Sequence, residues 1–397
     1  MGLLKKIPGV LYLSFYLTLL GLGAEGEELK SVKLVSGDAE INLSQHQGWV
    51  PLVQTVVNLT EINGIKSTFL FRTFDPEGVV FYGDTLQGQD WFTLALKDGI
   101  PEMQIGKADI LASMHGGPKL NDGKWHLMEI SNHGDFVRLD VNHQKAVVLG
   151  LTSKMADVVQ TGQIRLALGG ILVSPDKLFV PFQPAMDGCI REGNWLNLGI
   201  PWEQKGETKP CYENIKPGSY FSGSGLAEFN TTALPGQHTE EPGITIDIYG
   251  DSTTLNGTIL SLNTPGQELA TMTLTVDNNL KRTTFKILPN DKLTISGKTF
   301  KRLSIILLKE KVILRTFDGN LDSTEVSTAS KLVPDYASGW RNGRILSFGG
   351  PYRHGAPDHS PKYLTGCLEK IQVQGQDIDL DLAQYKHFTI SSHSCPL

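Results

Sequence analysis

Apolar and polar residues alternate with a period of two along much of this chain. The stretch 91–97 reads Trp-Phe-Thr-Leu-Ala-Leu-Lys and the stretch 136–141 reads Phe-Val-Arg-Leu-Asp-Val, so every second side chain there is apolar. Ile244, Ile246 and Ile248 continue the pattern in the second half. Residues two apart in a β-strand share one face, so the pattern predicts strands with one buried and one solvated face.

Turn-forming residues separate the predicted strands at short intervals. Asp, Asn, Pro and Gly occur at 75–78, 97–99, 121–123 and 133–135. Helical periodicity is nearly absent. Many short strands with such turns are typical of an all-β sandwich or barrel.

One sequence pattern occurs twice, 178 to 180 residues apart. Arg165–Gly170 reads Arg-Leu-Ala-Leu-Gly-Gly, and Arg344–Gly350 reads Arg-Ile-Leu-Ser-Phe-Gly-Gly. A Gly-Cys pair follows each segment and ends at Cys189 and Cys367 respectively. A repeat of this length indicates two copies of a whole domain.

Each copy is expected to end at its second cysteine. This places one domain at residues 25–212 and the other at 213–397, with 214–225 as a short linker rich in Gly and Ser. Two local disulfides, Cys189–Cys211 and Cys367–Cys395, are the simplest of the three possible pairings. A zinc site is the alternative, but no Cys-x-x-Cys pair supports it.

The first 24 residues have the pattern of a secretory signal peptide. Lys5 and Lys6 precede an apolar run over 7–22, which ends in the small residues Gly23 and Ala24. A transmembrane anchor is the alternative, but the run is shorter than the roughly 20 apolar residues that span a bilayer, and no basic cluster follows it. We therefore expect a secreted, extracellular protein without a membrane span.

The charge of the chain argues against two kinds of partner. Removing the signal peptide takes away two lysines, so the formal net charge falls from −6 to about −8. An acidic protein is poorly suited to bind nucleic acid or an anionic membrane surface. The secreted interpretation makes the Asn-x-Ser/Thr sequons candidates for glycosylation; they lie at Asn42, Asn58, Asn230 and Asn256.

The sequence motifs of common enzyme classes are missing. The chain has no His-Glu-x-x-His motif and no phosphate-binding loop. Its Gly-Ser-Gly segment, at 223–225, lies in the predicted linker and not between a strand and a helix, where a nucleophilic serine would be expected. A hydrolase or lectin-like enzyme is therefore disfavoured.

Two polar residues fall on otherwise apolar strand faces. Ser67 shares a face with Phe69 and Phe71, and Asp90 shares a face with Phe92. One interpretation places both residues at the rim of a sheet, where water or a loop amide satisfies them. The other is a cavity between two sheets, with apolar walls and a few polar groups that hold the ends of an amphipathic ligand.

Two carboxylates flank a proline in the turn Asp75-Pro-Glu77. Together with backbone carbonyl groups they could hold Ca²⁺, a hard ion that prefers oxygen ligands. The alternative is a solvated acidic turn.

Four segments resemble those of a known family. Residues 71–85 read Phe-Arg-Thr-Phe-Asp-Pro-Glu-Gly-Val-Val-Phe-Tyr-Gly-Asp-Thr, 123–126 read Gly-Lys-Trp-His, and 186–191 read Met-Asp-Gly-Cys-Ile-Arg; the fourth is the Arg165–Gly170 segment. Together they resemble the sex hormone-binding globulin family, which is built from two laminin G-like modules. The resemblance covers essentially the whole chain after the signal peptide, including both cysteine pairs.

The resemblance implies two tandem laminin G-like jelly-roll β-sandwiches, with a sex steroid inserted between the sheets of the first. In the family, the serine matching Ser67 binds the ring-A oxygen, and the aspartate matching Asp90 binds the hydroxyl group on ring D. Phe92 would lie against the flat face of the steroid. The other expected wall positions are Thr85, Ile105, Ile130, Val137, Leu166 and Leu196.

The resemblance also implies a metal site, an oligomeric state and a role. Asp75, Glu77 and the carbonyl group of Ala185 match a structural calcium site, and the first module is expected to form a homodimer. We expect a carrier that transports androgens and estrogens and regulates their free concentration. Such a protein is not an enzyme and has no organic cofactor.

Several positions depart from the family pattern. Lys107 stands where the family has a third polar contact, an asparagine, and a charge costs more to bury than an amide, so we expect an altered preference among steroids. Ala108 replaces a zinc-associated histidine, which weighs against a zinc effect. Asn132 and Ile164 replace methionines of the mammalian pattern. These departures favour a non-mammalian vertebrate member.

A second hypothesis comes from a different functional class. A laminin G-like adhesion or receptor-binding glycoprotein would have a packed core and no cavity. It would bind a protein or glycan in the presence of calcium, and it would have no affinity for steroids.

Overall fold

A computed structural model describes most of the chain after residue 28. The described residues are 29–33, 40–45, 48–62, 66–85, 88–107, 110–132, 136–150, 162–196, 201–205, 209–236, 243–267, 270–287, 291–309, 311–319, 323–329, 336–350 and 362–397. The predicted signal peptide at 1–24 and Ala108 lie outside these ranges.

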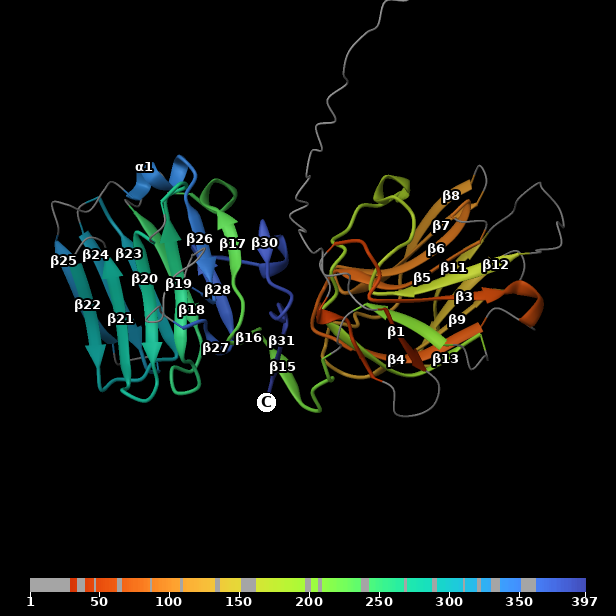
Figure 1. The fold of residues 1–397 in the computed structure, drawn as a ribbon, viewed down its shortest axis with the longest axis horizontal. Coiled ribbons are helices and arrows are strands. Elements are labelled where there is room, and N and C mark those ends of the chain that lie inside the picture. Colours follow the sequence, from red (N-terminus) through yellow and green to blue (C-terminus); the bar gives the residue numbers. More distant parts are fainter. Residues whose placement is uncertain are drawn as a thin grey trace, which may run out of the picture.

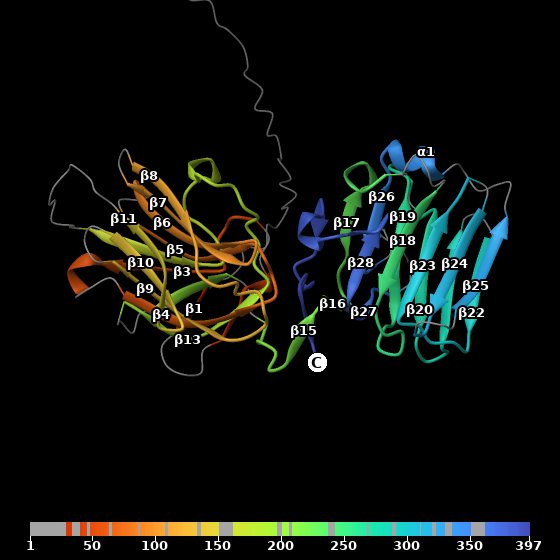
Figure 2. The ribbon, with the colours of Figure 1, turned by 180° about the vertical axis from the view of Figure 1, so that it is seen from behind.

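The regular structure is almost entirely β-strand, arranged as two sandwiches that lie side by side (Figures 1 and 2). The single α-helix within the described ranges is α1 (Tyr336–Arg341). This confirms the prediction of two tandem β-sandwiches. The period of two in the sequence predicted these strands, because a strand with one buried face needs apolar side chains only at alternate positions.

The first module consists of an eight-stranded and a six-stranded sheet. The strand order is β1-β14-β3-β12-β5-β6-β7-β8 in the eight-stranded sheet and β11-β10-β9-β4-β13-β2 in the six-stranded sheet. The strands are β1 (Leu29–Lys33), β2 (Ile41–Asn42), β3 (Val53–Asn58), β4 (Lys66–Thr73), β5 (Gly78–Thr85), β6 (Asp90–Lys97), β7 (Ile100–Lys107), β8 (Ile110–His115), β9 (His126–Asn132), β10 (Phe136–Val141), β11 (Gln144–Gly150), β12 (Gln163–Leu168), β13 (Gly188–Trp195) and β14 (Pro201–Lys205).

The second module repeats this architecture. Its larger sheet has the order β22-β21-β20-β19-β26-β17-β30 and its smaller sheet the order β25-β24-β23-β18-β28-β29, while β15-β31 and β16-β27 form two short pairs. The strands are β15 (Ile215–Pro217), β16 (Ser219–Ser222), β17 (Ala227–Asn230), β18 (Ile244–Tyr249), β19 (Gly257–Asn263), β20 (Met272–Asp277), β21 (Arg282–Ile287), β22 (Asp291–Ser296), β23 (Arg302–Leu307), β24 (Lys311–Phe317), β25 (Ser323–Ala329), β26 (Ile345–Phe348), β27 (Thr365–Leu368), β28 (Lys370–Val373), β29 (Gln376–Asp377), β30 (Tyr385–Lys386) and β31 (Ser394–Pro396).

Each module has its own apolar core between its two sheets. The core of the first module extends from Ile41 to Trp202, and the core of the second extends from Phe221 to Ile390. A smaller apolar cluster lies on the outer face of the eight-stranded sheet, where Tyr82 and Trp91 pack against Phe182. Both modules are therefore folded around separate buried cores.

Both disulfides form in the predicted pairing. Cys189 is bonded to Cys211 in the first module, and Cys367 is bonded to Cys395 in the second. The alternative of a zinc site at these cysteines is therefore excluded.

The predicted linker at 214–225 is not a linker. β15 and β16 lie within it, and they pair with β31 and β27 of the second module. Gly218 between them has φ +140°, and a Cβ atom there would lie 2.9 Å from the sulfur of Cys395 and 3.0 Å from that of Cys367. The glycine therefore allows close packing against the disulfide. In the sequence alone, the same glycine suggested a flexible linker.

Candidate functional site

Cross-strand pairing aligns four of the predicted wall positions of the eight-stranded sheet in two adjacent rows. In the first row, Leu166 is paired with Gly83, Gly83 with Phe92, and Phe92 with Ile105. Leu166, Phe92 and Ile105 all belong to the core of the module or pack against it, so this row faces the interior. The residues come from four consecutive strands of the sheet, β12, β5, β6 and β7.

The second row lies two residues nearer to the end of the sandwich and has a polar centre. Ile164 is paired with Thr85, and Thr85 with Asp90. Since Trp91 is paired with Gly106, the next positions place Asp90 across from Lys107 on the same inner face as Phe92 and Ile105. Asp90, Lys107 and Thr85 are all half-buried. A carboxylate and an ammonium group thus lie on neighbouring strands at the rim.

The six-stranded sheet supplies the opposite wall. Trp195 is paired with Ser67, Ser67 with Ile130, and Ile130 with Leu139. Ser67 is only 3% exposed, and its neighbours in the row belong to the core, so its hydroxyl group lies on the inner face. Val137 is two residues nearer to the end of the sandwich, paired with Asn132. Ser67 and Asp90 therefore belong to facing sheets.

The two remaining wall features are a turn and a missing side chain. Leu196 follows β13 with φ +56°, and this left-handed turn leaves its side chain buried at 2% exposure. Gly83 stands between Leu166 and Phe92 and contributes no side chain to the inner face. A Cβ atom at Gly83 would lie 3.2 Å from Leu166 Cδ2. The side chain of Leu166 therefore packs against the backbone of Gly83 on the inner face of the sheet.

An aromatic cluster lies beneath these rows. Trp195 stacks on Phe69 with ring centroids 5.2 Å apart, and it also contacts Phe81 and Trp202 at 5.5 and 5.2 Å. Phe81 in turn meets the edge of Phe92 at 6.1 Å. Sequence analysis missed Trp195 and Phe81, because pairing between distant strands cannot be deduced from a local period of two. This cluster gives the interior rows a rigid, apolar floor.

Several apolar residues near the candidate site are not fully buried. Phe92 and Ala112 are only partly buried although they pack against the core, and so are Leu59 and Ile62 in the segment that follows β3. Of the ten predicted ligand residues, six are buried, and Thr85, Asp90, Phe92 and Lys107 are half-buried near the end of the module. That arrangement suits an elongated, mostly apolar ligand with polar groups at its ends.

The predicted calcium residues lie together at the opposite end of the module. Asp75 is 1% exposed; its Oδ1 accepts a hydrogen bond from Glu77 N at 3.0 Å and its Oδ2 accepts one from Asp187 N at 2.7 Å. Glu77 Oε1 accepts from Gln183 N at 2.9 Å. The carbonyl oxygen of Ala185 lies against Gly78, 2.2 Å from where a Cβ atom would stand. The two carboxylates of the turn and the neighbouring carbonyl group of Ala185 thus offer oxygen atoms, the kind of ligand that calcium prefers.

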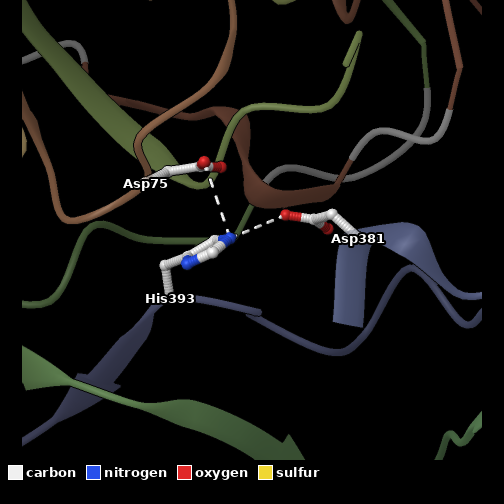
Figure 3. A group of neighbouring side chains, drawn as sticks. All are labelled: Asp75, Asp381 and His393. Atoms are coloured by element: carbon white, nitrogen blue, oxygen red, sulfur yellow. Dashed lines mark hydrogen bonds and ion pairs between the residues drawn. The ribbon is translucent and has the colours of Figure 1, made fainter. Parts of the chain in front are cut away.

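Asp75 also contacts the second module, a feature that sequence analysis missed. His393 Nε2 lies 3.5 Å from Asp75 Oδ1 and 3.0 Å from Asp381 Oδ2 (Figure 3). It also lies 3.4 Å from Asp379 Oδ1. Burial alone would lower the pKa of His393, but the surrounding carboxylates raise it well above its usual value. Lys386 also bonds Asp381. An imidazolium group thus connects acidic residues of the two modules.

The four sequons differ in exposure. Asn42 is 3% exposed, its side chain donates to Pro210 O at 3.1 Å, and it accepts from Ser44 N at 2.9 Å. Its interpretation as a glycosylation candidate is contradicted by this burial, which the sequon triplet alone does not reveal. Asn58 and Asn230 are exposed, and Asn256 is half-buried.

Comparisons with known proteins identify the fold class. The family model for the laminin G domain matches residues 71–198. The solved structure of domains LG4-5 of the mouse laminin alpha1 chain aligns with a TM-score of 0.65 at 17% identity, over 95% of this chain and 99% of that one. The molecule is therefore a tandem laminin G-like protein.

Sequence relatives narrow the class to a family. Sex hormone-binding globulin of Rattus norvegicus is 32% identical over 364 residues, which are 89% of this chain and 86% of the rat protein. The Homo sapiens protein of the same name is 35% identical over 227 residues, which are 57% of this chain and 56% of that protein. The chain belongs to the sex hormone-binding globulin family, as the sequence motifs predicted.

This assignment also bears on catalysis and on membrane insertion. The relatives are binding globulins and not enzymes, which confirms the prediction that the chain is not an enzyme. In the part of the chain that the structure describes, no helix has the length and apolar character needed to cross a membrane.

Proposed function

We propose that this protein is a secreted carrier that binds a sex steroid between the two sheets of its first module. The observation that carries the proposal is the pair of facing rows: Ser67 on one sheet, Asp90 on the other, and apolar side chains between them. A rigid tetracyclic ligand loses little conformational entropy on binding. Its buried apolar surface contributes about 25 cal/mol per Å², less the cost of association.

The polar residues would fix the orientation of the steroid. The Ser67 hydroxyl group would donate to the ring-A oxygen, and Asp90 would accept from the ring-D hydroxyl group. Lys107, beside Asp90 on the neighbouring strand, can only donate, so the two together suit a ligand group that both donates and accepts. This makes the ring-D end the place where the steroid preference of this chain departs from that of its mammalian relatives.

We also propose a structural calcium ion and a homodimer. Asp75, Glu77 and the carbonyl group of Ala185 would hold the ion at the end of the module remote from the ligand. β8 is one of the two described edge strands of the eight-stranded sheet, and its Leu111 and Met114 are 47% and 45% exposed. An edge strand with exposed apolar side chains is suited to pair with a second copy.

The steroid proposal is tested by replacing Ser67. Ser67→Ala should weaken the binding of dihydrotestosterone by about 1–3 kcal/mol, because the buried ring-A oxygen loses its donor; each 1.4 kcal/mol is about tenfold in Kd. The measurement is titration of the full chain with radiolabelled dihydrotestosterone. Thr68→Ala, on the same strand but on the opposite face, is the matched control and should bind normally.

Two results would contradict the proposal. Unchanged affinity in Ser67→Ala would mean that the ligand does not lie in this pose. An unmodified chain without saturable steroid binding in a charcoal-adsorption assay would favour the adhesion or receptor-binding alternative.

A further inference from the structure

The two modules meet through polar contacts. Each apolar core cluster of the described residues lies wholly within one module, so no shared apolar core joins them. Lys209 Nζ donates to Phe388 O at 3.2 Å across the junction, and the rings of Tyr212 and Tyr220 meet edge to face at 5.9 Å. The relative orientation of the modules therefore depends on a small number of directional contacts.

Asp187 makes two of these contacts from a buried position. This carboxylate of the first module is 3% exposed. Its Oδ2 accepts hydrogen bonds from two consecutive main-chain amides of the second module, His393 N at 2.7 Å and Ser394 N at 2.9 Å. Its Oδ1 accepts from the hydroxyl group of Ser44, within the first module. Hydrogen bonds to an ionised acceptor are stronger than neutral ones, and burial protects them from competing water.

The segment that Asp187 holds is firmly part of the second module. Ser394 begins β31, which pairs with β15, and it lies opposite Pro217, which has no N–H group. The next residue, Cys395, is bonded to Cys367. The Ser392 hydroxyl group and the His393 imidazole both bond Asp381. A force on this segment is therefore transmitted to the body of the second module.

We infer that residues 392–394 form a latch, with Asp187 as its acceptor, that fixes the orientation of the second module against the first. The His393 side chain adds the contact to Asp75 described above, so two carboxylates of the first module hold two consecutive residues of the second, His393 and Ser394. The positioning is done mainly by backbone amides. The orientation of the modules therefore depends on the carboxylate of Asp187 and not on the identity of the side chain at position 394.

The latch lies far from the candidate ligand site. β4 begins beside Ser67 and ends at Thr73, next to the turn that contains Asp75, and β13 begins directly after Asp187 and ends at Trp195. Eight residues of extended chain separate the two ends by about 23 Å. Opening the latch should therefore change the arrangement of the modules without disturbing the residues of the ligand site.

Replacing the acceptor in the full chain tests the latch. Asp187→Ala should accelerate hydrogen–deuterium exchange in a peptide spanning 391–397 by at least about tenfold and increase the radius of gyration measured by X-ray scattering. Asp187→Asn keeps one acceptor oxygen without the charge and should give an intermediate rate. Ser44→Ala is the matched control, since it removes the other partner of the same carboxylate and leaves both amide contacts intact.

The outcomes separate a latch from a folding role. Unchanged exchange and scattering in Asp187→Ala would overturn the inference. Ser44→Ala would overturn it too if it matched Asp187→Ala, because the effect would then pass through the first module. Loss of the near-ultraviolet circular dichroism in Asp187→Asn would also overturn the inference. Asparagine has nearly the same shape as aspartate, so such a loss would mean that the carboxylate is needed for folding. The scattering and exchange measurements use no steroid, so they decide this inference whether or not the chain binds one.

Discussion

Gly83 shows how one missing side chain can shape an interior. Its neighbours in the row, Leu166 and Phe92, project from the same face of the sheet, so the glycine leaves a shallow strip between two apolar groups. The positive-φ glycines of the chain have a different function; Gly83 is not among them, so its backbone conformation does not require glycine. What distinguishes the position is that the side chain of Leu166 packs directly against it.

A single methyl group at position 83 would change the packing of Leu166 on the inner face of the sheet. Gly83→Ala would place Cβ 3.2 Å from Leu166 Cδ2, a contact that a small rotation of the leucine relieves. We expect steroid affinity to fall about tenfold or more, while the free energy of unfolding changes by less than about 1 kcal/mol. Equilibrium ligand titration and urea unfolding measure the two effects. Gly150→Ala, where no atom lies within 4 Å, is the control; undiminished affinity in Gly83→Ala would place the ligand elsewhere.

At the scale of the element, the edge strand β8 carries the proposed dimer. Its burial pattern differs from that of the strands inside the sheet, because Leu111 and Met114 are exposed where interior strands bury their apolar residues. The strand is short, but no proline or lysine occurs in it to discourage pairing with another strand. A second copy could continue the sheet there.

A charge on this edge should prevent association. Leu111→Lys is expected to convert the dimer to a monomer at micromolar concentration, with circular dichroism unchanged, because pairing would bury an unpaired ammonium group. Light scattering coupled to size-exclusion chromatography measures the mass. Leu280→Lys, at an exposed leucine of the second module, should leave the mass unaltered. A dimer that persists in Leu111→Lys would mean that another surface forms the interface.

Element formation was largely predictable, and the spatial relations between elements were not. The period of two placed Ser67 and Asp90 on inner faces because it is a local property of each strand. The pairing of Trp195 with Ser67 depends on which distant strands meet, and the contact of His393 N with Asp187 spans 206 residues. The family resemblance supplied the roles of the ligand residues, while the inter-module contacts had no counterpart in any local pattern.

On the scale of the whole molecule, a bound calcium ion would raise the free energy of unfolding. A ligand that binds only the folded state stabilises it by RT ln(1 + [L]/Kd), about 2.7 kcal/mol at a hundredfold excess over Kd. Since Asp75 is buried, its neutralisation by a bound cation should stabilise the surrounding turn of the first module.

Removal of calcium should therefore lower the melting temperature. Adding a chelator to the full chain is expected to lower the first thermal transition by several degrees, and excess calcium should restore it. Glu77→Gln keeps the contact to Gln183 N but removes a charge, and it should reduce the calcium-dependent shift. Asp98→Asn, in an exposed turn, should retain the full shift. A melting temperature insensitive to both chelator and calcium would exclude the ion.

The separation of the two ends of the first module has a practical consequence for experiments on this protein. The ligand residues surround one end of the sandwich, and the second module is attached at the other (Figure 1). A chain anchored to a sensor surface through the part of its second module remote from the junction would present the ligand end of the first module to the solution. Association and dissociation of small ligands could then be followed on the immobilised protein without the anchor obstructing their path.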